Sequence, residues 1–512
     1  MFAKSLCGRA GSAVRCSSRG AAMPLKAKVT NPAFGGRAQM ATESRQGGLS
    51  GNEPEVIREL PGDEKEDVLF DTLFGVRTIE LNRPKKLHSL NGSMIRKIIP
   101  RLQEWAKSDI ANVVIIKGSG PKAFCAGGDV AALAEENLKG VEGQQKSTEY
   151  FALEYKLDHL IATYQKPYVA FIDGITMGGG VGLSIHAPFR IATERTVFAM
   201  PETTIGFFPD VGASFFLPRM PGGVGTYLAL TSEKLRGVNV FYAGVATHYI
   251  HSTSLPALER RLAELRFKDY DPLPERLQLI NSTIEEFCTG LPHDEPIHIQ
   301  GELRNAIDRC FTKTSVPDII AALKAEEGET REWAQKTLAT LHQRSPTAVY
   351  VTLRQMQLGK NWSISETFVR EHQIAAKFMA HPDFTEGVHA LLIRKDGKPA
   401  WKPASLEDVN PKDNIADDFF KVAEGSQRLR LLNQDDYKEY PHGGYSIPSE
   451  AAIQSVVNKG ELSQRSIVKH FVQQRRGKQG VKEIVQEVID RKTKRGENGK
   501  AVWITEEEAP TS

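Results

Sequence analysis

The chain has 512 residues, of which 40% are hydrophobic and 25% are charged, a balance typical of a globular protein. Its formal net charge is only +3, which is too small for overall charge alone to indicate a nucleic-acid-binding protein. The chain contains no apolar run long enough to span a bilayer, so a membrane-spanning helix is not expected. At this length, two or three structural units are expected.

The N-terminus has the composition of a mitochondrial presequence. Residues 1–42 contain seven basic residues and no Asp or Glu, and Ser and Ala are frequent. Presequences are basic, serine-rich and poor in acids, and no apolar core suited to a secretory signal is present. We therefore predict a presequence over residues 1–45 and a protein of the mitochondrial matrix. A merely disordered N-terminus is the alternative. The polar and acidic residues 46–64 are expected to form a linker.

The folded part is expected to begin near Asp67. The segment 68–81 predicts two paired strands, with Gly75 near their turn. Asn91 or Ser93 can then cap a helix, in which Pro100 is expected to introduce a kink. The apolar face of this helix is formed by Ile95, Ile98, Ile99 and Leu102.

Two glycine-rich loops each follow an apolar run. Residues 113–116 lead to KAFCAGGD (122–129), and residues 168–172 lead to ITMGGGVGLS (175–184). We expect each run to be a buried strand and each loop to open a helix, the first near Asp129. Glycines leave the first backbone N–H groups of such helices uncovered, and the helix N-terminus adds a partial positive charge. Two such loops can supply two donors to one oxyanion.

Two acids follow the second loop. Glu202 comes after Pro201, and Asp210 comes after Pro209, eight residues further on. Oxyanion donors beside a pair of carboxylates indicate acyl chemistry rather than binding alone. The alternative is that the glycine triplet is only a tight turn and that both loop acids are solvated.

The motifs KAFCAGGD and GITMGGGVGLS resemble those of the crotonase (enoyl-CoA hydratase) superfamily. The long segment 177–219, MGGGVGLSIHAPFRIATERTVFAMPETTIGFFPDVGASFFLPR, is most similar to its 3-hydroxyisobutyryl-CoA hydrolase branch. The resemblance covers roughly residues 65–410. It implies an α/β fold, a crotonase-like spiral of stacked ββα turns over residues 65–270, followed by a helical region over residues 271–420.

The same resemblance implies roles for individual residues. The backbone N–H groups of Gly128 and Gly179 would polarise the carbonyl of an acyl-CoA thioester. Glu202 would act as base or nucleophile, with Asp210 positioning it or the substrate, and Glu154, in the helical run 144–164, would line the acyl pocket. Further substrate contacts are implied for Lys85, Lys86, Leu87 and Ala126, although two lysines before a helix could be ordinary solvated charge. No metal or cofactor is implied, and neither a dinucleotide-binding nor an ATP-binding motif occurs.

Three functions remain open at this stage. The resemblance favours hydrolysis of 3-hydroxyisobutyryl-CoA to 3-hydroxyisobutyrate and CoA, a step of valine catabolism. Enoyl-CoA hydration is the first alternative, but hydratases use a second glutamate at the position of Gly182, which carries no carboxylate. The second alternative is a component of the small subunit of the mitochondrial ribosome, because fungal relatives of this branch are known there.

Strand signals fade after residue 272. Helices are expected at 303–311, 316–323, 332–342 and 345–358. In crotonases such helices cap the acyl pocket and build oligomer contacts, which leaves a homo-oligomer open. The cysteines beyond the presequence are scattered, and Cys125 in the first loop is interpreted as a small packing residue rather than a catalytic thiol.

Residues 421–512 extend beyond the resemblance. The segment 459–500 contains twelve Lys or Arg and five Asp or Glu. Within it, Val481, Ile484, Val485, Val488 and Ile489 follow the spacing of an amphipathic helix. This basic extension could bind RNA phosphates, including those of a mitochondrial ribosomal subunit, an anionic membrane face or a partner protein. A solvated extension without a partner is the alternative.

Overall fold

The computed structural model describes residues 56–268, 271–422, 428–497 and 499–504. The predicted presequence and the first half of the predicted linker therefore lie outside the described residues. Within these ranges, no helix combines the length and the apolar character needed to cross a membrane.

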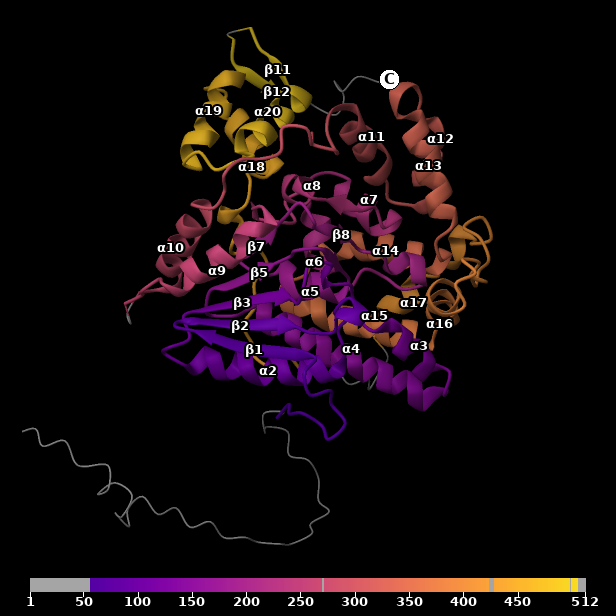
Figure 1. Ribbon diagram of the computed structural model, residues 1–512. Coiled ribbons are helices and arrows are strands. Elements are labelled where there is room, and N and C mark those ends of the chain that lie inside the picture. Colours follow the sequence, from indigo (N-terminus) through magenta and orange to yellow (C-terminus); the bar gives the residue numbers. More distant parts are fainter. Residues whose placement is uncertain (1–55, 269–270, 423–427, 498, 505–512) are drawn as a thin grey trace, which may run out of the picture. The chain divides into compact units, whose positions relative to one another are not determined.

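Two sheets form the frame of the fold (Figure 1). The larger has the strand order β1 (Val68–Leu73), β2 (Val76–Leu81), β3 (Val113–Gly118), β5 (Tyr168–Phe171), β7 (Phe189–Ala192) and β10 (His248–Tyr249). The smaller has the order β4 (Ala123–Cys125), β6 (Ile175–Met177), β8 (Val197–Ala199) and β9 (Leu235–Arg236). Apart from the antiparallel pairs β1–β2 and β8–β9, neighbouring strands in both sheets are parallel.

Successive strands alternate between the two sheets. β3 is followed by β4, β5 by β6, and β7 by β8, so each turn of the chain adds one strand to each sheet. The helices α2 (Gly92–Lys107), α3 (Val130–Asn137), α4 (Val141–Ala162) and α5 (Gly179–Ile185) lie between these strands in sequence. This arrangement confirms the α/β spiral predicted from the sequence.

The first part of the spiral, from β1 to α2, confirms several local predictions. β1 and β2 pair through a turn at Gly75. The side chain of Asn91 caps α2 by accepting a hydrogen bond of 2.9 Å from the backbone N–H of Met94. α2 continues through Pro100 rather than ending there.

Both faces of β3, inside the larger sheet, are buried. Val113 and Ile115 of β3 pack against α9 (Leu255–Ala263) and α10 (Leu273–Glu285) on one face. Val114 and Ile116 point to the opposite face and join the main core. A parallel strand covered on both sides needs a continuous apolar sequence, which explains the run at 113–116.

The region over residues 271–420 is helical, as predicted. The four expected helices are α11 (Gly301–Phe311), α12 (Val316–Ala325), α13 (Arg331–His342) and α14 (Pro346–Gly359). They are followed by α15 (Ile364–Ala380), which packs along α4, and by α16 (Pro382–Val388) and α17 (Asp417–Phe420). The short helices α6 (Ala213–Phe216), α7 (Val224–Thr231) and α8 (Val238–Tyr242) lie between β8 and β10, within the spiral.

The last part of the C-terminal extension, from residue 450 onward, folds around a small apolar core of its own, whereas residues 429–447 pack against the main core. This last part consists of α18 (Glu450–Val457), α19 (Gln464–Gln474), α20 (Val481–Lys492) and the hairpin β11 (Thr493–Arg495) with β12 (Ala501–Trp503). α20 confirms the predicted amphipathic helix. Val481, Val485, Val488 and Ile489 pack against the apolar side chains of α18 and α19, so most of the apolar face of α20 is internal.

Candidate active site

The smaller sheet delivers both glycine-rich loops to one place. β4 ends at Cys125, and its parallel neighbour β6 ends at Met177, directly before α5. The carboxyl ends of parallel neighbours lie at the same edge of a sheet, so the loops that follow them meet. A Cβ atom placed on Gly179 would lie 3.4 Å from the backbone nitrogen of Gly128.

Each glycine of the triplet is required for its own reason. Gly178 has a φ of 44°, in the region that favours glycine. A Cβ atom on Gly179 would lie 2.5 Å from Oε1 of Glu154, and one on Gly180 would lie 2.2 Å from the carbonyl oxygen of Cys125. The triplet is therefore a tightly packed junction between two loops, and more than a turn.

The backbone N–H groups of Gly128 and Gly179 have no hydrogen-bond acceptor among the residues that the structure describes. α5 begins at Gly179, so this amide has no acceptor within its own helix. Further along α5, the N–H groups of Val181 and Gly182 bond back to the carbonyl of Gly178 at 2.7 and 3.1 Å. The junction thus presents two unpaired donors from two different loops.

Two carboxyl groups from distant segments face this junction. Glu154 lies on α4, and Glu202 begins the short 3-10 turn η3 (Glu202–Ile205); both are buried. Oε1 of Glu202 is 3.0 Å from the position that a Cβ on Gly178 would take. Oε1 of Glu154 is 2.5 Å from the position that a Cβ on Gly179 would take. The structure therefore brings together Glu154, Glu202 and the two glycines predicted as oxyanion donors.

Asp210 is held beside α4 by a tyrosine. The hydroxyl of Tyr155 donates a hydrogen bond of 2.7 Å to Oδ2 of Asp210, and both residues are buried. Glu371 on α15 accepts hydrogen bonds from the backbone N–H groups of Gly212 (2.7 Å) and Ser214 (2.9 Å). These bonds anchor the loop on which Asp210 lies.

The sequence analysis missed Asp158 and Glu371. Asp158 lies one helical turn after Glu154, on the same buried face of α4. A Cβ atom on Gly182 would lie 2.6 and 2.8 Å from its two carboxyl oxygens, so Asp158 fills the space that a side chain at position 182 would need. Neither oxygen has a hydrogen-bond partner in the described part of the chain. Two acids spaced i, i+4 within the apolar pattern of 144–164 were the available signal.

Aromatic rings exclude water from this group of carboxyls. Phe207 and Phe208, in the FFPD segment that ends at Asp210, stack on Phe151 and Phe378 with ring centroids 5.1 and 5.6 Å apart. All four rings belong to the main buried core. An ionised carboxylate loses favourable hydration in such surroundings.

Burial accordingly raises the pKa of every carboxyl in the group. The pKa of Asp210 is raised to about 7, against the opposing hydrogen bond from Tyr155, and that of Glu371 is raised to about 8. Desolvation, followed by the charge of Asp210, raises the pKa values of Glu154 and Glu202 well above their ordinary value. Desolvation and the charge of Glu154 do the same for Asp158. Such a cluster does not ionise fully at neutral pH, so proton donors and acceptors coexist in it.

The residues that the resemblance assigned to CoA lie beside the first loop. The carbonyl of Leu87 accepts a hydrogen bond of 3.0 Å from the backbone N–H of Ala126, which places these two residues together. Lys85 and Lys86, in the 3-10 turn η2 (Pro84–Lys86), have exposed side chains, and Nζ of Lys86 is 3.9 Å from a carboxyl oxygen of Asp129. They stand at the surface, near the loop that carries Gly128.

Cys125 is buried at the end of β4, and burial raises the pKa of its thiol to about 12. A thiol with such a pKa stays protonated at neutral pH and is a poor nucleophile. This geometry agrees with the interpretation of Cys125 as a packing residue.

Comparison with known proteins identifies the family. The profile described as enoyl-CoA hydratase/isomerase matches residues 76–420, and the chain belongs to this family, as the crotonase-like motifs predicted. The crystal structure of a carnitinyl-CoA dehydratase from Mycobacterium thermoresistibile is similar, with a TM-score of 0.62 and 32% sequence identity over 72% of this chain and 100% of that chain.

Two relatives of this chain carry different names and match different shares of it. The small ribosomal subunit protein mS47 of Neurospora crassa is 57% identical over 503 residues, covering 96% of this chain and 97% of that protein. The mitochondrial 3-hydroxyisobutyryl-CoA hydrolase of Danio rerio is 46% identical over 344 residues, covering 67% of this chain and 87% of that protein. The match to mS47 thus includes most of residues 421–512, whereas the family profile ends at residue 420.

Proposed function

We propose that the protein is an acyl-CoA thioester hydrolase that converts 3-hydroxyisobutyryl-CoA to 3-hydroxyisobutyrate and CoA in valine catabolism. Membership of the enoyl-CoA hydratase/isomerase family supports an enzyme that acts on CoA thioesters. The name of the Danio rerio relative supports the hydrolase and a mitochondrial location, for which we propose the matrix. The observation that carries the proposal is the meeting of two unpaired backbone N–H groups with two buried carboxyls at the Gly128–Gly179 junction.

In the proposed mechanism, the N–H groups of Gly128 and Gly179 donate to the thioester oxygen as negative charge develops on it. Glu202 either removes a proton from the attacking water or attacks the carbonyl carbon itself, giving an anhydride that water then hydrolyses. In both routes the C–S bond breaks, and the sulfur of CoA takes up a proton. Asp210 positions Glu202 or the substrate hydroxyl, and a protonated carboxyl of the cluster supplies the proton.

The arrangement at Gly182 favours hydrolysis over enoyl-CoA hydration. A second catalytic glutamate would have to stand at this position, and the carboxyl of Asp158 already fills the space beside it. Asp158 is an enclosed group with no hydrogen-bond partner among the described residues.

The test is CoA release from 3-hydroxyisobutyryl-CoA by the parent protein and by Glu202→Gln. We expect rapid release by the parent and a loss of about a hundredfold or more in the variant, the range for a general base. Glu104→Gln, an exposed position on α2, is the matched control and should behave as the parent. Hydration of crotonyl-CoA at a comparable rate would instead support the hydratase, and no turnover of either substrate would remove the catalytic proposal.

A second candidate function, association with the small subunit of the mitochondrial ribosome, is supported by the match to mS47 across the extension. Arg465, Lys469 and Lys482 have exposed side chains on α19 and α20, where they can meet RNA phosphates. We expect the protein to sediment with mitochondrial small subunits at low salt and to dissociate at high salt.

Replacing these three residues together by Glu should abolish the sedimentation with small subunits, while Glu202→Gln should leave it unchanged. Sedimentation free of ribosomes at low salt would count against this function without affecting the hydrolase proposal.

A further inference from the structure

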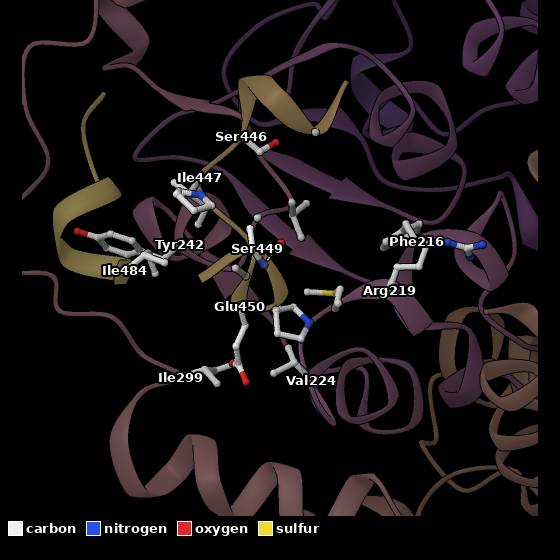
Figure 2. Close-up of a pocket in the computed structure, with 18 of the residues that line it drawn as sticks. Phe216, Arg219, Val224, Tyr242, Ile299, Ser446, Ile447, Ser449, Glu450 and Ile484 are labelled. Carbon is white, nitrogen blue, oxygen red and sulfur yellow. Dashed lines mark hydrogen bonds between the residues drawn. The ribbon is translucent and has the colours of Figure 1, made fainter. Parts of the chain in front are cut away.

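A second hollow lies away from the carboxyl cluster, where the extension meets the core (Figure 2). Its volume is about 680 Å3, within the range of small-molecule sites. α5 separates the two places, because Gly179 at its first residue belongs to the carboxyl site while Ile185 at its last residue lines the hollow. The core segments 215–224 and 239–245, the segment 439–450, and α20 supply most of the remaining wall.

Much of this wall is apolar. Figure 2 shows Tyr242 and Ile484 on one side of the hollow and Phe216 on the other, with Ile447 and Ile299 between them. These side chains come from five separate segments of the chain. An apolar ligand segment of moderate length would be removed from water on several sides at once, which is favourable in proportion to the area covered.

Three arginines that line the same cavity have no carboxylate partner. Arg190 donates to the carbonyls of Val245 (2.6 Å) and Ala187 (2.7 Å) and to a tyrosine hydroxyl. Arg219 donates only to backbone carbonyls, and Arg475 donates to the carbonyl of Gly444.

Among the described residues none of the three arginines forms an ion pair, and Nε of Arg475 is buried without a hydrogen-bond partner. Arg190 is buried, and Arg219 and Arg475 are half-buried. Buried cations are normally paired with an anion.

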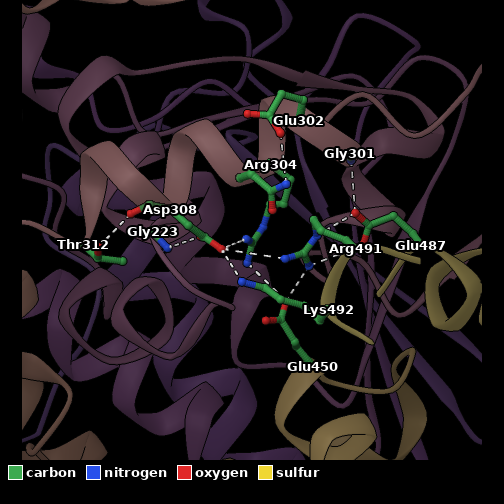
Figure 3. Close-up of polar contacts among 11 residues, drawn as sticks. Gly223, Gly301, Glu302, Arg304, Asp308, Thr312, Glu450, Glu487, Arg491 and Lys492 are labelled. Atoms are coloured by element: carbon green, nitrogen blue, oxygen red, sulfur yellow. Dashed lines mark hydrogen bonds and ion pairs between the residues drawn. The ribbon is translucent and has the colours of Figure 1, made fainter. Parts of the chain in front are cut away.

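Two of the three acids in the wall are paired with other arginines, and the third, Glu439, acts on Arg219 only through its charge, without an ion pair. Glu450 pairs with Arg491 at 2.7 Å and Glu487 pairs with the same guanidinium at 2.8 Å (Figure 3). Arg304 joins this network from α11, at 3.4 Å from Glu450. The remaining acid, Glu439, is exposed. The lining holds five arginines and three glutamates, so it carries an excess of positive charge.

We propose that this cavity binds a small organic anion with an apolar chain. The anionic head, a carboxylate or a phosphate monoester, is held by the unpaired arginines, and the chain lies along the apolar wall. Arg491 closes the cavity from α20, where its ion pairs tie the extension to α11. Because the ligand contacts both the core and the extension, its binding stabilises the docked extension.

The test is calorimetric titration of the full chain with decanoate and, separately, with decyl phosphate, each below its micellar concentration. We expect one saturable site for at least one of the two anions, and the better probe identifies the head group. Decanol, which has the chain without the charge, should bind about tenfold more weakly or worse, the range for a lost hydrogen bond to a charged group.

Variants locate the site. Arg475→Gln should weaken binding about tenfold or more, and Ala243→Phe should block the cavity from α8. Ser446→Phe fills the cavity from the segment 439–450 and serves if Ala243→Phe fails to fold. Arg331→Gln, an exposed position at the start of α13, is the charge-matched control.

The absence of a saturable site for both anions would overturn the proposal. Equal binding by the filled and parent cavities would overturn it as well. Loss of binding in Gly179→Ala with normal binding in Ala243→Phe would place the anion at the carboxyl site instead and would equally overturn it.

Discussion

The hydroxyl of Tyr155 bonds to Asp210 at 2.7 Å, although the two residues are 55 positions apart in the chain. Tyr155 follows Glu154 directly on α4, so the helix that places one carboxyl against Gly179 also fixes a second one. This bond counteracts the desolvation of Asp210 and keeps its pKa at about 7, close to the pH at which the enzyme would work.

Tyr155→Phe should change the pH dependence of thioester hydrolysis. Loss of a hydrogen bond to a charged group costs about 1.5–3 kcal/mol, which raises the pKa of Asp210 by about one to two units. If the ionised form of Asp210 is needed, the rising limb of kcat/KM moves to higher pH, and activity lost at pH 7 returns above pH 8. The buried Tyr164 bonds to the carbonyl of Leu102, so Tyr164→Phe is the control. An unshifted limb would contradict this role of Tyr155.

Gly179→Ala should abolish hydrolysis while the fold is kept. The new Cβ atom would lie 2.5 Å from Oε1 of Glu154 and 3.4 Å from the nitrogen of Gly128, so it displaces the carboxyl and covers the donor. Losing one oxyanion donor costs about a hundredfold or more in kcat. Gly62→Ala, where a Cβ meets nothing within 4 Å, should leave kcat unchanged. Steady-state kinetics with far-UV circular dichroism decides the matter, and normal turnover by Gly179→Ala would refute the proposed oxyanion site.

Asp158→Asn should stabilise the protein increasingly as the pH rises. The folded pKa of Asp158 lies well above its unfolded value, so the folded state binds more protons and parent stability falls as pH rises above about 4. The slope is about 1.4 kcal/mol per pH unit for one such group, up to its folded pKa. The thermal midpoints of variant and parent should therefore diverge between pH 5 and pH 8, in favour of the variant. The exposed Asp109→Asn should show no such divergence.

Gly182→Ala should destabilise the fold through Asp158. The added Cβ atom would lie within 2.8 Å of both carboxyl oxygens of Asp158 and of Cβ of Val211, and overpacking of this kind costs about 1–3 kcal/mol. Asp158→Ala in the same chain removes part of the clash, so the double variant should lose less stability than the sum of the single variants. Urea unfolding of the four proteins measures this coupling, and strict additivity would show that the two residues do not compete for space.

Arg491→Ala should loosen the extension. Its side chain is 3% exposed, and its guanidinium lies 2.7 Å from Glu450, 2.8 Å from Glu487 and 3.8 Å from Asp308. Removing one partner of a buried ion pair costs about 3–5 kcal/mol, because the remaining charges stay buried. Hydrogen exchange over residues 450–503 should become faster in the variant and stay normal in Lys482→Ala, an exposed position on the same helix. Unchanged exchange in Arg491→Ala would show that the ion pairs do not hold the extension in place.

Local pattern alone determined much of this protein. The paired strands, the two glycine-rich loops, the helices from residue 301 to 359 and α20 follow from periodicity and turn chemistry within short windows. The motifs around Gly128, Gly179, Glu202 and Asp210 likewise pointed to one acyl-CoA site, and the structure brings these residues together.

Only the tertiary structure decided which further groups share the site. Glu371 reaches the loop at Gly212 across 159 positions, and Asp158 takes the space beside Gly182 because α4 packs against α5. The raised pKa values of the carboxyls and the arginine-lined cavity also depend on segments that are far apart in the sequence. Desolvation and charge proximity depend on contacts between distant segments, which a short sequence window does not contain.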